Sequence, residues 1–263
     1  MTDVSIARPG MLRALLNAVR MYLGLTLFGV SCFVWSILAL PLYYVLPQRA
    51  GMRLGRRTIS AGFRLYLNAL TWMGACRFDL SALDALKEQG PVIIAPNHPS
   101  LIDAVMVLSR LPGLECIMKS KIMDNPCLGA GARLARYIRN DDPHSMIRQA
   151  VSELRGGNQL LLFPEGTRSD GHPIGRLCGS TGLIAKQAHV PVQTVLIELD
   201  SPFLTKGWSP AHVPQTPITY RVRLGRRFDP PENAQGFAVQ LDAYFTHALA
   251  DATLPRPIIM THG

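Results

Sequence analysis

The feature that most constrains this chain is a stretch without any charge, which runs from Met21 to Gln48. As a helix, about 25 of its residues measure roughly 37 Å, more than the roughly 30 Å of hydrocarbon in a bilayer. Trp35 and Tyr44 within the stretch, and Arg20 and Arg49 at its ends, are typical of a helix anchored at membrane interfaces. The stretch is too long for a cleavable signal peptide. It predicts an N-terminal membrane helix that either spans the bilayer or lies in one leaflet.

The positive charge of the chain belongs to the same region. Residues 1–78 hold nine arginines and one acidic residue, Asp3, whereas residues 79–263 hold 18 Lys and Arg against 17 Asp and Glu. The segment from Thr58 to Gly74 mixes apolar residues with arginines, which predicts an amphipathic helix held against anionic headgroups by Arg49 to Arg64. A buried helical hairpin of a soluble protein is the alternative. Nucleic-acid binding is disfavoured, because the arginines flank an apolar run and do not form a stacking surface.

The cysteines indicate neither a zinc site nor a disulfide framework. The chain has five, an odd number, and none forms a C-x-x-C pair. This pattern is typical of a protein in a reducing compartment.

Beyond residue 75, short apolar runs alternate with helical patterns. The runs that predict strands are CRFDL (76–80), PVIIAP (91–96), GLECIM (113–118), QLLLFP (159–164), VPVQTVLIEL (190–199) and TYRVRLGRRF (219–228). The last alternates with a period of two and predicts an edge or antiparallel strand. The order predicts an α/β fold with a mostly parallel sheet flanked by helices. We therefore expect membrane-anchoring helices in residues 1–74 and one α/β domain in residues 75–255.

Two polar clusters follow predicted strands, NHPSLID at residues 97–103 and FPEGTRS at 163–169. Sites in such sheets gather beyond the carboxyl ends of the strands, so the clusters can converge on one pocket. His98 is a proton acceptor near neutral pH, and a carboxylate such as Asp103 can orient its ring. Two alternatives stay open: Ser100-x-x-Asp103 is also a capping box with Ser100 as N-cap, and the second cluster is also a solvated turn. A metal site lacks a convincing third ligand.

The pairing of NH-x-x-x-x-D with FPEGTRS, over roughly residues 75–200, resembles the glycerolipid acyltransferases of the lysophosphatidic acid acyltransferase family. The resemblance implies that His98 is the general base and Asp103 its orienting partner. It also implies an acceptor site with a phosphate-binding arginine, made of Arg139 together with Glu165, Gly166, Thr167 and Arg168. The sequence departs from the family near Pro191, where Thr194 stands near the place of a usual second proline.

The resemblance, together with the N-terminal apolar helix, implies a membrane-bound O-acyltransferase of phospholipid biosynthesis. It would transfer a fatty acyl group from acyl-CoA or acyl carrier protein to the free hydroxyl of a lysophospholipid such as lysophosphatidic acid. The thioester is already activated, so no metal or other cofactor is required; Lys119 and Lys121 are candidates for contacts with the donor's phosphates. The alternatives are a non-glycerol lyso-lipid acceptor, such as an amino-acid lipid, and a non-catalytic lipid-binding membrane protein. The three arginines before the apolar stretch and the five after it favour a catalytic domain on the cytoplasmic face of a bacterial cytoplasmic membrane.

Overall fold

The computed structural model describes residues 10–126, 128–169 and 174–250, and a seven-stranded sheet lies at the centre of this part of the chain. The strands are β1 (Cys76–Asp79), β2 (Ile93–Pro96), β3 (Glu115–Met118), β4 (Ile138–Arg139), β5 (Leu160–Leu161), β6 (Val192–Leu199) and β7 (Ile218–Phe228). Their order is β1-β7-β6-β2-β5-β3-β4. Only β6 and β7 pair antiparallel among these neighbours. The mostly parallel α/β sheet is therefore confirmed. β7 is antiparallel to β6 and parallel to β1, and it lies inside the sheet and not at its edge.

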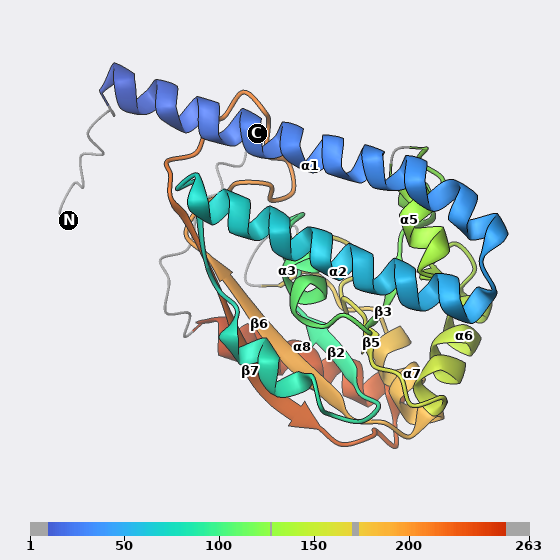
Figure 1. Cartoon of the computed structure of the whole chain (residues 1–263). Coiled ribbons are helices and arrows are strands. Elements are labelled where there is room, and N and C mark those ends of the chain that lie inside the picture. Colours follow the sequence, from blue (N-terminus) through green and yellow to red (C-terminus); the bar gives the residue numbers. More distant parts are fainter. Residues whose placement is uncertain (1–9, 127, 170–173, 251–263) are drawn as a thin grey trace.

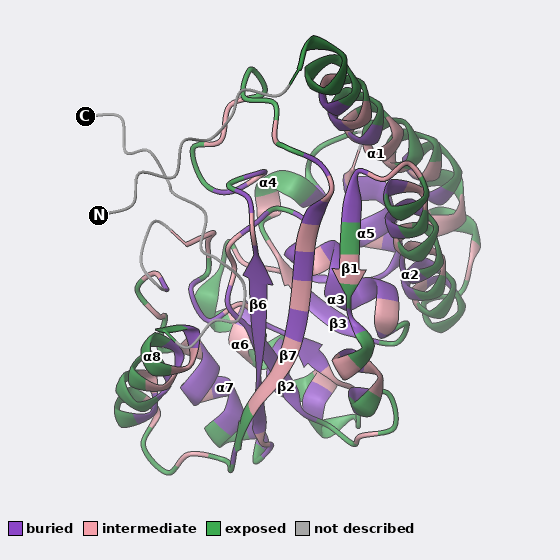
Figure 2. Ribbon diagram, turned by 90° about the vertical axis from the view of Figure 1, so that its left-hand side faces the viewer, coloured by how far each residue is buried: buried purple, intermediate pink, exposed green. Residues whose placement is uncertain are grey.

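Helices cover both faces of the sheet (Figures 1 and 2). One face carries α1 (Met11–Val45), α2 (Gln48–Trp72), α3 (Asp103–Arg110) and the 3₁₀ helix Ser81–Leu86, and the other carries α6 (Pro143–Arg155), α7 (Ser180–Ala188) and α8 (Ala234–Ala250). Successive residues of β2 alternate between the two layers: Ile94 packs in the core under α1–α3, while Ile93 and Ala95 pack under α6–α8. This double burial explains why the strand is apolar at every position.

The short helices α4 (Ser120–Met123) and α5 (Gly129–Leu134) follow β3. In Figure 1, α5 lies beside the C-terminal end of α1. Ala39 of α1 packs there against Ala130 and Leu134. The far end of α1 is therefore attached to the α/β body.

The first helix is longer than the apolar stretch, because it begins at Met11, and Pro41 lies inside it. Its length and composition suit a membrane-crossing helix. However, α1 runs along the body beside α2 (Figure 1). One side of α1 is buried against the body at residues three or four positions apart, including Asn17, Met21 and Gly24. The opposite side leaves a row of large apolar side chains exposed.

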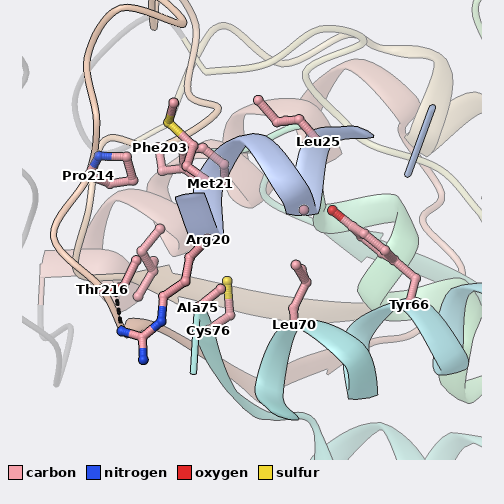
Figure 3. A pocket seen from close by; sticks show the side chains of 12 residues that line it. Arg20, Met21, Leu25, Tyr66, Leu70, Ala75, Cys76, Phe203, Pro214 and Thr216 are labelled. Atoms are coloured by element: carbon pink, nitrogen blue, oxygen red, sulfur yellow. Dashed lines mark hydrogen bonds between the residues drawn. The ribbon is translucent and has the colours of Figure 1, made fainter. Parts of the chain in front are cut away.

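The N-terminal half of α1 is joined to the loop that precedes β7. Arg20 donates from Nη1 to Thr216 Oγ1 over 3.0 Å, as Figure 3 shows, and Thr216 Oγ1 donates to Asn17 Oδ1 over 2.7 Å. A cavity of about 10 Å³ lies at this junction, and Met21 of α1 and Phe203 of the loop region both line it (Figure 3). So small a space holds about one water molecule, so the junction is close-packed.

The second helix is one continuous element that packs into the body. The sequence predicted that Arg56 faces headgroups, but its side chain is buried, forms an ion pair with Glu115 and donates from Nε to Ala135 O over 3.1 Å. Gly55 allows this close approach: a Cβ on it would lie 2.7 Å from the Ala135 nitrogen. The helix therefore presents Arg49, Arg53, Arg57 and Arg64 to the outside, but not Arg56.

Candidate active site

Asn97 extends the pairing of β2 with β6 beyond the end of β2. Its side-chain Nδ2 donates to Ile197 O over 3.0 Å, and Ile197 N–H donates to Asn97 Oδ1 over 2.7 Å. The side chain thus makes the two hydrogen bonds that a backbone partner would make, where Pro96 ends the strand. This bond pair determines where the chain leaves the sheet and so where His98 begins.

His98 and Asp103 are in direct contact. His98 Nδ1 lies 2.8 Å from Asp103 Oδ2, and the same oxygen accepts the Ser100 N–H over 2.7 Å. Asp103 is the first residue of α3, with Ile102 and not Ser100 at the N-cap position. Burial raises the pKa of Asp103 above its usual value, and the hydrogen bond with His98 opposes that rise. The carboxylate therefore both orients the imidazole and holds the turn before the helix.

The second cluster wraps around His98. Glu165 is buried, and its Oε1 accepts the His98 N–H over 2.8 Å while Ser169 N–H donates to His98 O over 2.9 Å. The Phe163 ring stacks on the imidazole with ring centroids 4.0 Å apart. The expected convergence of the two strand-exit clusters is thus confirmed. The described hydrogen bonds of His98 involve its backbone groups and Nδ1.

Both carboxylate oxygens of Glu165 accept hydrogen bonds from backbone N–H groups. Its second oxygen, Oε2, accepts the Gly175 N–H over 2.7 Å. A Cβ on Gly175 would lie 2.7 Å from that oxygen, so a larger residue would require the Glu165 carboxylate to shift. Next to it, Gly166 takes a left-handed conformation (φ +64°) at the end of a turn closed by its N–H to Phe163 O over 3.0 Å. Glu165 therefore links the His98 backbone to the Gly175 loop.

Two cationic side chains lie at the second cluster: Lys119 contacts it, and Arg168 is part of it. Lys119 follows β3, and its Nζ lies 3.2 Å from Thr167 Oγ1. Arg168 is half-buried and donates from Nη1 to Leu204 O over 3.0 Å and to Thr205 O over 2.9 Å. Lys119 and Arg168 thus place positive charge on the same side of the sheet as His98.

No sequence pattern indicated the role of residues Phe203–Thr205. Besides the bonds from Arg168, Leu101 N–H donates to Leu204 O over 3.1 Å, and Ser100 Oγ donates to Phe203 O over 3.4 Å. Carbonyl groups of this one segment therefore bind both clusters. Backbone carbonyls occur at every residue, so the amino-acid types could not reveal this contact.

Arg139 lies apart from these residues. Its strand β4 is three positions from β2 in the sheet, a separation of about 14 Å. The guanidinium pairs with Asp124 (Nη1 to Oδ1, 2.7 Å) and Asp141 (Nη2 to Oδ2, 2.7 Å). Among the described residues, no group of three His, Cys, Asp or Glu side chains is placed to hold a metal ion.

Known proteins resemble this chain in sequence and in fold. The family model described as Acyltransferase matches residues 77–198. A lyso-ornithine lipid O-acyltransferase of Pseudomonas aeruginosa is 31% identical over 192 residues, which span 71% of this chain and 69% of that protein. This chain belongs to the acyltransferase family. The matched segment of the acyltransferase contains both clusters and Arg139.

Two further relatives agree with this assignment. A 1-acyl-sn-glycerol-3-phosphate acyltransferase, also of P. aeruginosa, is 24% identical over 226 residues, covering 84% of this acyltransferase and 83% of that protein. The crystal structure of PlsC from Thermotoga maritima, a 1-acyl-sn-glycerophosphate acyltransferase, superposes with a TM-score of 0.66 at 17% identity. The superposition covers 91% of this chain and 96% of that one. The protein is therefore an acyltransferase of lipid metabolism with the fold of PlsC, as the motifs predicted.

Proposed function

We propose that this acyltransferase transfers a fatty acyl group from acyl-CoA or acyl carrier protein to the free hydroxyl of a lysophospholipid. The observation that carries the proposal is the contact of His98 Nδ1 with Asp103 Oδ2 over 2.8 Å at the exit of β2. With Nδ1 bound to the carboxylate, the neutral ring has its lone pair on Nε2, which can accept a proton. That is the requirement for activating an alcohol.

In the proposed reaction, the acceptor hydroxyl gives its proton to His98 Nε2 as its oxygen attacks the thioester carbonyl. The tetrahedral intermediate collapses with loss of the thiolate, which takes the proton from the imidazolium. The products are an ester and a free thiol, and no proton or electron is left over. Asp103 stabilises the imidazolium between the two steps, and a positioned base of this kind contributes about 10²–10⁴-fold to the rate.

For the acceptor headgroup we propose the surface formed by Gly166, Thr167 and Arg168. Lys119, whose Nζ lies 3.2 Å from Thr167 Oγ1, is kept as the candidate for a contact with the donor's phosphates beside this surface. Arg168 uses Nη1 for the carbonyls of Leu204 and Thr205, and its planar fork has further donors for a phosphate. Glu165 has both oxygens engaged by backbone N–H groups, so we assign it the positioning of His98. Arg139 is the outermost candidate for a phosphate contact, and it would have to compete with its own two aspartates.

A second acceptor class is supported by the relative with 31% identity, which is a lyso-ornithine lipid O-acyltransferase. An amino-acid lipid offers a hydroxyl for the same chemistry without a phosphate. The pairing of Arg139 with Asp124 and Asp141 supports this alternative too, because it reduces the charge available to a phosphate. The two acceptor classes share the roles proposed for His98 and Asp103.

For localisation we propose the cytoplasmic face of a bacterial cytoplasmic membrane. The outer side of α1 exposes Leu15, Val30, Phe33 and Ile37, among others. A helix packed along the body by one side can place its other side in the headgroup and acyl boundary. We therefore favour insertion of α1 into one leaflet over a helix that crosses the bilayer.

The test is a thiol-release assay with purified full-length protein in detergent. Acyl-CoA and acyl carrier protein are each offered with lysophosphatidic acid, lysophosphatidylcholine and lyso-ornithine lipid, and the esters are identified by mass spectrometry. We expect thiol and diacyl lipid to appear in equal amounts with at least one pair. The preferred acceptor separates the two acceptor classes. Thiol release without ester formation by any acceptor would contradict the proposal.

A further inference from the structure

Tyr220 is a fully buried tyrosine of β7, on the face of the sheet that carries α1, α2 and α3. It is in register with Phe78 of β1 and with Leu199 of β6. Its ring stacks on the Phe78 ring with centroids 5.4 Å apart. A phenylalanine would make the same apolar contacts at this position. The hydroxyl group is therefore the part of the side chain that packing does not explain.

The Tyr220 hydroxyl has no hydrogen-bond partner among the described residues. The same is true of Asp103 Oδ1, the carboxylate oxygen that does not contact His98. Buried polar atoms are nearly always paired, because an unpaired one loses its hydration without compensation. A donor and an acceptor with the same deficiency in one core point to a connection between them.

Ser100 is the residue that is close to both groups. It is fully buried, and its N–H donates to Asp103 Oδ2 over 2.7 Å. Burial, and after it Cys76, raises the pKa of Tyr220 well above its usual value. The Ser100 side chain opposes this rise in pKa, and the charge of Asp103 adds to it. The Tyr220 hydroxyl therefore lies near the Ser100 side chain and within the field of the Asp103 carboxylate.

The Ser100 hydroxyl is only weakly bound by its other partners. It donates to Phe203 O over 3.4 Å and accepts the Ile102 N–H over 3.4 Å. Both distances are long for a hydrogen bond. A serine hydroxyl can accept and donate at once, and its hydrogen rotates to suit the better acceptor. Ser100 Oγ can therefore accept from Tyr220 and donate to Asp103 Oδ1.

The reaction proposed above requires a charged Asp103. Its carboxylate has to stay ionised in the core while the imidazolium forms, although burial raises its pKa. Oδ2 contacts His98 Nδ1 and the Ser100 N–H, which leaves Oδ1 as the oxygen that can take another donor. A hydrogen bond to the ionised form of a carboxylate favours that form.

We propose that Tyr220 is a positioning residue, whose hydroxyl donates to Ser100 Oγ while Ser100 Oγ donates to Asp103 Oδ1. The two hydroxyl groups stabilise the carboxylate opposite the imidazolium and fix its orientation toward His98. The proposal rests on the roles proposed for His98 and Asp103. A wild-type protein that transfers no acyl group to any acceptor contradicts those roles. An active wild type with an equally active Tyr220→Phe variant contradicts this proposal alone.

The first test compares Tyr220→Phe with Tyr66→Phe in the full-length protein, by thiol release with the preferred acceptor and by thermal unfolding. Each substitution removes only the hydroxyl group of a buried tyrosine in the same hydrophobic cluster. Tyr66 lines the small cavity beside α1 (Figure 3), so it serves as the control.

We expect Tyr220→Phe to lower kcat by about tenfold, as the loss of a hydrogen bond that supports a charged group predicts. The KM values of both substrates should stay within about twofold of wild type, because the interaction matters in the transition state. The Tm should stay close to that of wild type. Tyr66→Phe should leave kcat within about twofold of wild type, since its hydroxyl is assigned no such role.

Double-mutant cycles separate an effect through Asp103 from a change in packing. In an Asp103→Asn background the supported charge is absent, so Tyr220→Phe should change kcat by no more than about twofold. Ser100→Ala interrupts the connection, and Tyr220→Phe should add as little in that background. Mass spectrometry of the ester keeps slow variants measurable. Unchanged kcat in Tyr220→Phe, an equal fall in Tyr66→Phe, or the same tenfold fall in both backgrounds would each overturn the proposal.

Discussion

His98 is held by its backbone as well as by its ring, because Glu165 and Ser169 bind its N–H and C=O while Asp103 binds Nδ1. The side chain itself is 17% exposed and lies at a strand exit, where its ring stacks on Phe163. We therefore expect His98→Ala to lower kcat by about 10²–10⁴-fold with little change in Tm. Thiol release and thermal unfolding of the same preparation check this. Activity within tenfold of wild type would remove His98 as the base.

Asp103 has two partners on one oxygen, and a substitution can separate them. Asp103→Asn keeps an oxygen for the Ser100 N–H but loses the charge that stabilises the imidazolium. We expect a large fall in kcat with a modest fall in Tm. A large loss of stability with normal turnover of the folded fraction would show that Asp103 serves the turn alone.

A substitution of Glu165 can distinguish a role in positioning His98 from a role in binding the acceptor. Glu165→Gln has one acceptor oxygen for two backbone N–H groups, those of His98 and Gly175. An unpaired buried donor disfavours the native arrangement by about 1–3 kcal/mol, so we expect kcat to fall about tenfold or more. The KM for the lysolipid should stay nearly constant. A raised acceptor KM with unchanged kcat would instead place Glu165 in contact with the acceptor.

At the scale of elements, two glycines of α2 serve as a matched pair. Gly55→Ala would place a Cβ 2.7 Å from the backbone of Ala135, whereas a Cβ on Gly62 meets nothing within 4 Å. We expect the first to lower the free energy of unfolding by about 1–3 kcal/mol. Gly62→Ala should raise it by about 0.5–1 kcal/mol, since alanine favours a helix interior. Chemical denaturation in detergent measures both. Equal effects would show that α2 does not approach α5 this closely.

At the scale of the whole molecule, the N-terminal helices and the sheet share one core. Met21, Leu67 and Leu70 pack in the same hydrophobic cluster as strand residues. In addition, Glu115 of β3 forms an ion pair with Arg56 of α2. Removal of residues 1–74 would uncover that cluster and leave a buried carboxylate unpaired, which costs about 3–5 kcal/mol. We therefore expect residues 75–263 alone not to fold.

Circular dichroism and limited proteolysis of the truncated protein test this expectation. Within the full chain, Arg56→Ala should be strongly destabilising, and Arg57→Ala, at an exposed position of the same helix, should change the free energy of unfolding by no more than about 0.5 kcal/mol. A truncated chain that unfolds cooperatively and releases thiol on a soluble acceptor would show that residues 1–74 are only an anchor.

Local patterns in the sequence were sufficient for six of the seven strands in the described residues, all but the two-residue β4, and for the two clusters. The apolar runs predict the strands because burial on both faces favours apolar residues at every position, as in β2. β6 is also buried at every position, but its Gln193, Thr194 and Glu198 side chains are hydrogen-bonded to groups of β7. His98 and the FPEGTRS segment could be paired without coordinates, because carboxyl ends of neighbouring parallel strands lie at one edge. The uncharged stretch predicted the long helix α1, whose composition alone makes it suited to a membrane.

Only the tertiary structure decided which atoms meet. Asn97 bonds to Ile197 one hundred residues away, and Phe203–Thr205 supplies carbonyls that no side-chain pattern marks. Periodicity reports whether a residue is buried but not what it faces, so Arg56 looked like a headgroup contact until Glu115 was seen beside it. Likewise, an acidic residue in a motif can bind either a substrate or a backbone N–H group, and the sequence does not distinguish the two. Glu165 binds the backbone because the folded loops bring two donors to it.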